Sequence, residues 1–117
     1  MLNRHFSGRK DPEDFAGKVV LVTGAASGLG RGITMAFARA GSDLVLVDID
    51  REGLLETAAM VEDAGSRSLV KRVDVSDREG MERMAGEVLS DWGRVDVLVN
   101  NAGVGVGGEL NDIPLQS

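Results

Sequence analysis

The sequence has neither cysteine nor tyrosine, and its single histidine, His5, stands in a polar N-terminal segment. Without cysteine there can be no disulfide framework and no thiolate chemistry. Without tyrosine, the chain can supply only carboxylates, lysines and one imidazole as general acids or bases. No apolar run approaches the length of a membrane span, and no hydrophobic signal-peptide core follows Met1. We therefore expect no membrane partner.

The charge balance is acidic, with 19 Asp and Glu residues against 13 Lys and Arg residues and a net charge of −6. This balance argues against DNA or RNA as the main partner. A hydrophobic content of 43% is sufficient for a packed core, and 117 residues correspond to one domain or part of one. We expect a cytoplasmic protein that binds no nucleic acid.

The chain divides into a polar segment over residues 1–16, predicted to be a tail or linker, and residues 17–117, predicted to be the N-terminal part of a domain. In the second part, short apolar runs alternate with helical patterns, which is typical of βαβ units and a parallel sheet. Strands are predicted over residues 19–22, 44–47, 68–73 and 95–99. The mixed polarity of residues 68–73 favours an edge strand.

Two further local predictions concern the helices between these strands. Ile33, Ala36, Phe37 and Ala40 follow the i, i+3, i+4, i+7 spacing of one buried helix face. Before the third helix, Ser76 and Glu79 have the spacing of a capping box, which predicts Ser76 as the N-cap. The Met and Trp stripe of this third helix is interpreted as core packing rather than a cofactor contact.

The segment Thr23–Gly30 follows the first strand and opens the first helix with three glycines. Free backbone N–H groups at a helix start, with the positive end of the helix dipole, favour an anion such as a pyrophosphate. Glycine is needed where the turn is tight or where the phosphates approach the backbone. No Lys-Ser or Lys-Thr follows the last glycine, which excludes a P-loop. The alternative is that the glycines serve only the turn and helix packing.

Asp48 ends the second strand, on the carboxyl side of the sheet where ligands of such sheets bind. Its carboxylate could accept hydrogen bonds from both hydroxyls of an adenosine ribose, and it would repel a 2′-phosphate. We therefore predict NAD rather than NADP as the cofactor. The alternative is that Asp48 caps the following helix together with Asp50.

The remaining two strand ends also carry polar groups. Asp74 and Val75 offer a carboxylate beside a backbone amide, which could bind the amino group and ring edge of adenine. Equally, Asp74 could be a turn residue before Ser76. Asn100–Gly103 combines asparagine amides with small residues, a pattern that lets backbone pass close to a ligand and ties strand ends together.

Together these four segments resemble the short-chain dehydrogenase/reductase family. Thr23–Gly30 matches the family's TGxxxGxG turn, and Asn100–Gly103 matches its NNAG motif. The resemblance extends from about Lys18 to Gly103. It implies a Rossmann-like, doubly wound parallel α/β sheet with strand order 3-2-1-4, truncated after the fourth strand.

The resemblance also implies a role for individual residues. Pyrophosphate contacts would come from Gly24, Ser27, Gly28 and Leu29. Asp48 would bind the adenosine ribose, and Asp74 and Val75 the adenine. The stretch toward the nicotinamide would be lined by Asn100, Ala102 and Gly103. Family members transfer hydride between a nicotinamide and a carbinol or carbonyl carbon, so we expect a small alcohol or carbonyl substrate and a homo-oligomeric full-length protein.

The family's catalytic Tyr-x-x-x-Lys pair has no counterpart in this tyrosine-free sequence. We expect the catalytic residues to lie beyond Ser117 and this chain alone to be inactive. Two alternatives stay open: a non-catalytic dinucleotide-binding module, and an interaction protein that pairs through the apolar edge of its fourth strand.

Overall fold

The computed structural model describes residues 15–102, and this part of the chain forms four strands and three helices. They follow one another as β1 (Val19–Thr23), α1 (Gly28–Arg39), β2 (Asp43–Asp48), α2 (Arg51–Asp63), β3 (Ser68–Arg72), α3 (Arg78–Trp92) and β4 (Val97–Val99). Strand and helix alternate without exception, as predicted. Gly103, the last residue of the predicted site, lies outside the described residues.

The four strands form one parallel sheet in the order β3-β2-β1-β4, which confirms the predicted order. All five residues of β1 are buried because this central strand has a neighbour on each edge and helices on both faces. The chain moves from β1 outward to β2 and β3, then returns to place β4 on the other side of β1. This reversal creates a crevice at the carboxyl ends of the strands, where ligands of such sheets bind.

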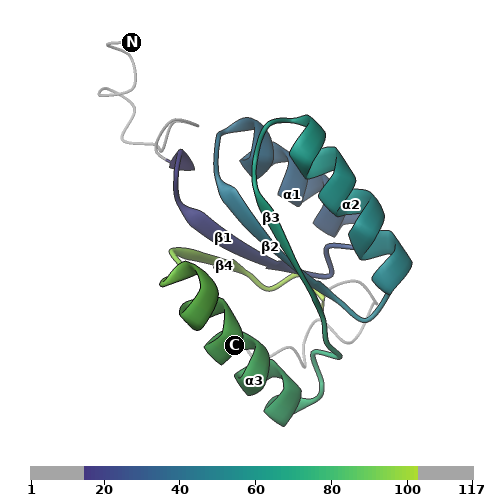
Figure 1. The fold of residues 1–117 in the computed structure, drawn as a ribbon. Coiled ribbons are helices and arrows are strands. Elements are labelled where there is room, and N and C mark those ends of the chain that lie inside the picture. The colour runs from purple at the N-terminus through teal and green to yellow at the C-terminus, as the bar shows by residue number, and fades with distance from the viewer. Residues whose placement is uncertain (1–14, 103–117) are drawn as a thin grey trace.

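Helices cover both faces of the sheet, with α1 and α2 on one face and α3 on the other (Figure 1). The first face packs through residues such as Val22, Leu46 and Leu54, and the second through Val45, Met84 and Val88. Because β2 is covered on both sides, its four central residues form a continuous apolar run rather than an alternating one.

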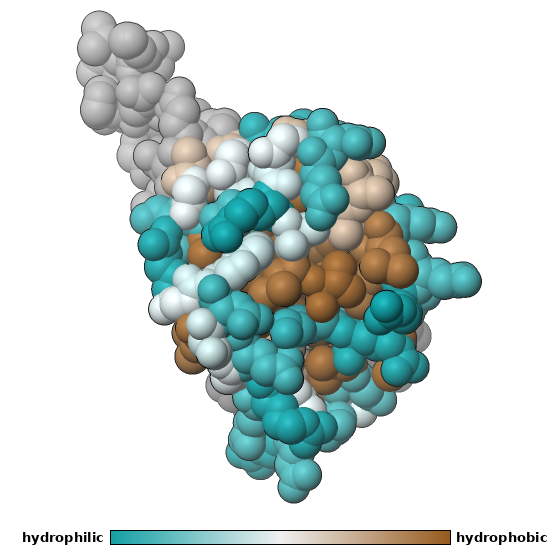
Figure 2. Space-filling model, viewed as in Figure 1, coloured by the Kyte–Doolittle hydropathy of each residue, from teal (hydrophilic) through white to brown (hydrophobic). Residues whose placement is uncertain are grey.

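The two outer strands differ in the way they meet the surface. Most of β3 is half-buried, and Lys71 in this strand pairs with Glu87 of α3 at 2.9 Å. Figure 2, viewed from the same side as Figure 1, shows apolar surface in the middle of the molecule, where β3 runs between α2 and α3. At the other edge, Leu98 of β4 is 57% exposed, in agreement with the predicted apolar fourth strand.

Two local predictions were wrong. The N-cap of α3 is Asp77, which accepts a hydrogen bond from the Gly80 amide, whereas Ser76 donates to Asp74. Asp77 competes successfully because a carboxylate is the stronger acceptor at a positive helix terminus. The fully buried face of α1 consists of Gly30, Thr34, Met35 and Ala38. Of the four residues predicted, Phe37 is half-buried against the core, whereas Ala36 is exposed. Gly30 sets this rotation of the helix because its backbone lies against the preceding turn.

The predicted tail contributes one anchored aromatic residue. Phe15 packs edge-on against Phe37 of α1, with ring centroids 5.1 Å apart. Its carbonyl also accepts hydrogen bonds from the Lys18 amide and, at 2.7 Å, from the Ser42 hydroxyl. Phe15 therefore covers the end of α1 near the start of β1.

Within residues 15–102, none of the helices combines the length and apolarity that crossing a membrane requires.

Asp96 joins the beginnings of β1 and β4. One of its carboxylate oxygens accepts hydrogen bonds from the Val19 amide at 2.8 Å and from Arg94 Nε at 2.7 Å. These bonds, first the one from Val19, hold the pKa of Asp96 below its ordinary value. Because the folded-state pKa is lowered, the stabilisation is present above the unfolded pKa of about 4 and is lost as the pH falls through the folded-state value.

We therefore expect Asp96→Asn to lower the free energy of unfolding at pH 7, and the difference from the parent chain to shrink below about pH 4. Urea unfolding followed between pH 3 and pH 7 measures this difference. Asp63→Asn makes the same charge change at an exposed position of α2 and serves as the control. A difference that stays constant over the whole pH range would show that the Asp96 carboxylate does not carry the effect.

Candidate functional site

The carboxyl ends of the strands surround a cavity of about 230 Å³. It is lined by Gly24, Asp48, Ile49, Val73, Asp74, Val75 and Ala102. Five of these seven residues belong to the predicted site, and they come from the ends of all four strands. Ile49 and Val73 were missed by the sequence analysis, although each is an apolar residue directly beside a predicted polar one. The parallel sheet therefore brings together segments that are up to 78 positions apart in the sequence.

A second and larger cavity, of about 420 Å³, lies between β3 and α3. It shares Ile49, Val73 and Asp74 with the first, and charged side chains of both signs line the rest of it, including Lys71, Arg83 and Glu87. None of the glycine turn reaches this larger cavity. The smaller cavity is the candidate site because it lies at the strand ends beside the glycine turn.

The glycine turn leaves the start of α1 open. Ser27 is the N-cap residue in an extended conformation, yet its side chain makes no capping hydrogen bond, and the first turn holds no acidic residue. In contrast, α2 and α3 are capped by the carboxylates of Asp50 and Asp77. Among the helices of residues 15–102, α1 alone thus presents its first amides without a side-chain acceptor. Such an end can bind an anion.

Two glycines of this turn have backbone conformations that favour glycine. Gly24 has φ +69°, and Gly28 has φ +56°. A Cβ on Gly24 would also lie 2.7 Å from the Asn101 side-chain nitrogen, so the segment after β4 and the turn are in direct contact there. Gly28, Ser27 and Leu29 do not line the cavity itself but form the adjoining start of α1, where Leu29 is 65% exposed.

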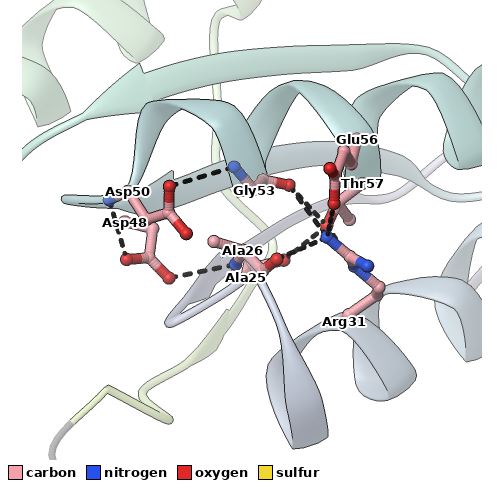
Figure 3. A network of polar contacts seen from close by, with 8 residues as sticks. All are labelled: Ala25, Ala26, Arg31, Asp48, Asp50, Gly53, Glu56 and Thr57. Carbon is pink, nitrogen blue, oxygen red and sulfur yellow. Dashed lines mark hydrogen bonds and ion pairs between the residues drawn. The ribbon is translucent and has the colours of Figure 1, made fainter.

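Asp48 holds the glycine turn through its carboxylate (Figure 3). Its Oδ2 accepts a hydrogen bond from the Ala26 amide at 3.0 Å, and its Oδ1 accepts from the amides of Ile49 and Asp50 at 2.7 Å and 3.1 Å. The capping role considered for Asp48 belongs to Asp50, which accepts from the Gly53 amide at 3.1 Å. A carboxylate has about four acceptor positions, so three bonds leave Asp48 capacity for a further donor.

Asp74 was predicted either to bind adenine or to form a turn before Ser76, and in the structure it forms this turn. Its carboxylate accepts hydrogen bonds from the backbone amide of Ser76 at 2.9 Å and from its hydroxyl at 2.7 Å. These two bonds lower the pKa of Asp74 from its ordinary value. Because Asp74 also lines the cavity, the turn interaction does not exclude the binding role. Val75 beside it is 38% exposed.

Thr23 connects the ends of β1 and β4. Its hydroxyl oxygen accepts hydrogen bonds from the amides of Asn101 and Ala102 at 2.9 Å and 3.1 Å. The same hydroxyl lies 3.1 Å from Asn100 Oδ1, to which it can donate. Asn100, predicted to lie along the ligand, therefore turns its side-chain oxygen toward Thr23 and is absent from the cavity lining. This role of Thr23 was not predicted from the sequence, although the position of the residue between a strand and the glycine turn indicates one.

Comparison with known proteins assigns this geometry to a family. The family model described as short chain dehydrogenase matches residues 18–117. Epidermal retinol dehydrogenase 2 of Homo sapiens is 45% identical over 106 residues, which cover 90% of this chain and 34% of that protein. The chain thus spans about a third of the length of this curated relative.

Two solved structures show the same fold. Hydroxysteroid dehydrogenase from Escherichia coli superposes with a TM-score of 0.76 at 32% identity, over 84% of this chain and 42% of that one. Carveol dehydrogenase from Mycobacterium avium in complex with NAD gives a TM-score of 0.73 at 35% identity, over 86% of this chain and 41% of that one. The family model matches residues 18–117, and the strand order and the crevice at the strand ends agree with that match. This chain therefore belongs to the short-chain dehydrogenase family.

Proposed function

We propose that this chain is the NAD(H)-binding part of an oxidoreductase that transfers hydride between a nicotinamide and the carbon of an alcohol or carbonyl substrate. The observation that carries the proposal is the cavity at the strand ends. It joins the carboxylates of Asp48 and Asp74 to the Gly24 turn, beside a helix start without a side-chain cap. The NAD complex of the similar carveol dehydrogenase supports the choice of cofactor.

The residues of the site fit the parts of this dinucleotide. The free amides at the start of α1, with the bare backbone of Gly24 and Gly28, would hold the pyrophosphate. Asp48 would use its remaining acceptor position for a hydroxyl of the adenosine ribose, while Asp74 and the Val75 amide would bind the adenine. Ala102 would lie along the path toward the nicotinamide. When bound, the nicotinamide supplies the carbon that accepts or delivers the hydride.

Catalysis requires more than these residues. The resemblance to the family implies a catalytic tyrosine, and this chain has none. We therefore propose that the purified chain binds NADH but does not oxidise or reduce alcohol and carbonyl substrates, because the acid–base groups are supplied by residues outside it. The same family resemblance supports a homo-oligomeric assembly for the protein that carries those residues.

Substitution of Asp48 tests the cofactor assignment. Asp48→Ser removes the charge that repels a 2′-phosphate and one acceptor of the ribose hydroxyls, so the ratio of NADPH to NADH affinity should rise by about tenfold or more. Fluorescence titration with each reduced cofactor measures the two dissociation constants.

Asp48→Asn is the matched variant for this experiment. It retains the size of the side chain and an acceptor for the Ala26 amide but removes the charge, so it should shift the affinity ratio with less loss of overall binding. If both variants retain the parental ratio of affinities, Asp48 does not contact the ribose. If the parent chain binds neither cofactor at millimolar concentration, the proposed function itself is wrong.

A second candidate function is a non-catalytic NAD-binding module, and the absence of tyrosine favours it equally. The two candidates make the same prediction for NADH binding. They differ in the gene: a tyrosine and a lysine four residues later, encoded downstream of Ser117, would support the enzyme. An extension without that pair would support the module.

A further inference from the structure

We propose that Arg31 and Thr57 are positioning residues: they hold the glycine turn in the conformation that places the first amides of α1 for the pyrophosphate. Through these two residues, helix α2 supports the cofactor site. This inference rests on the proposed function. Neither residue lines the cavity. Thr57 contacts the backbone of Ala25 and Arg31 contacts that of Ala26, two of the four residues between the end of β1 and the open start of α1.

Arg31 extends from the first turns of α1 across to α2 (Figure 3). Its Nη2 donates hydrogen bonds to the carbonyls of Ala26 and Gly53, the latter at 3.1 Å, and its Nε donates to the Thr57 hydroxyl at 2.8 Å. Nη2 also lies 3.1 Å from Oε1 of Glu56. A basic residue near a helix N-terminus opposes the helix dipole, so these contacts, rather than the stability of α1, account for an arginine here.

Thr57 completes the link on the side of α2. Its side chain is fully buried, and its hydroxyl donates a hydrogen bond to the Ala25 carbonyl at 2.8 Å. The neighbouring Gly53 brings the two segments into direct contact, because a Cβ there would lie only 2.7 Å from the Ala26 carbonyl oxygen. The backbone of α2 thus packs against the turn without an intervening side chain.

Every backbone polar group of this dipeptide consequently has a defined partner. The Ala25 amide donates to the Val47 carbonyl, and the Ala26 amide donates to Asp48. Thr57 and Arg31 bind the two carbonyls. With both carbonyls held in this way, the chain reaches Ser27 in one orientation, which fixes where the open start of α1 presents its first amides. Removing Arg31 or Thr57 leaves a buried carbonyl without its donor and frees the turn to rotate.

The test measures which part of the cofactor loses affinity. Arg31→Met and Thr57→Val should each weaken binding of NADH and of ADP by about tenfold, the effect of one unsatisfied buried carbonyl. Binding of adenosine, which has no phosphate, should change less than about twofold. Dissociation constants come from fluorescence titration for NADH and from NMR titration for ADP and adenosine.

Three further variants separate positioning from general damage. Thr57→Ser retains the hydroxyl and should bind as the parent chain does, whereas Arg31→Lys retains the charge but not the fork of donors and should remain weak. Glu56→Gln removes only the negative charge of the exposed partner of Arg31 and should have no effect. Equal loss for adenosine and ADP, or a Thr57→Val variant that binds ADP like Thr57→Ser, would overturn the inference. A parent chain that fails to bind NADH would instead refute the proposed function.

Discussion

Gly30→Ala should abolish NADH binding and lower the free energy of unfolding by at least about 3 kcal/mol. A Cβ at this position would lie 1.8 Å from the Gly24 carbonyl oxygen and 2.6 Å from the Gly24 carbonyl carbon. Both atoms are backbone, so no side-chain rotation relieves the contact. The first turn of α1 would have to separate from the glycine turn, and the amides proposed to bind the pyrophosphate would move with it.

Gly32→Ala is the matched control, two residues further along the same helix. A Cβ on Gly32 would meet nothing within 4 Å. Because alanine has the higher helix propensity, this variant should be more stable by about 0.5–1 kcal/mol and should bind NADH normally. Urea unfolding and fluorescence titration of the two variants give the comparison. Equal stability of Gly30→Ala and Gly32→Ala would contradict the close packing of α1 against the turn.

The same contact explains which part of the fold the sequence could not predict. The run of apolar residues placed β2 correctly, because the core there depends on ordinary apolar side chains such as Leu44 and Leu46. In α1, the packing is set by a residue without a side chain. A search for regularly spaced apolar side chains does not detect Gly30, which has none. It therefore predicted a helix face around Ala36, although Ala36 is exposed.

In the candidate site too, residues recognised by their polar side chains could be predicted, whereas residues that act through backbone contacts could not. Strand ends and polar residues sufficed to predict Asp48 and Asp74, since the carboxyl edge of a parallel sheet gathers whatever follows its strands. Contacts made through backbone carbonyls leave no such signal. Arg31 lies in a helix where a charged residue suggests only exposure, and its partners at Ala26 and Gly53 are main-chain atoms. These residues emerge only once α1, α2 and the turn are placed in space.

Thr23→Val should cost about 2–3 kcal/mol of stability and weaken NADH binding, although valine has nearly the shape of threonine and a higher hydrophobicity. Thr23 is 2% exposed, and its hydroxyl is the partner of the Asn101 and Ala102 amides and of the Asn100 side chain. These bonds fix the end of β4, a strand of only three residues that pairs with β1 alone within the described sheet.

Loss of the hydroxyl affects binding because Ala102 lines the cavity beside Gly24. Without its acceptor, the Ala102 amide must turn toward water, and the wall of the cavity on the β4 side moves with it. Thr23→Ser is the matched control: it retains the hydroxyl and loses one methyl group, which costs about 0.8 kcal/mol. Serine should therefore preserve NADH affinity and most of the stability. If serine and valine are equally damaging, the methyl group, and not the hydrogen bonds to β4, is what this position requires.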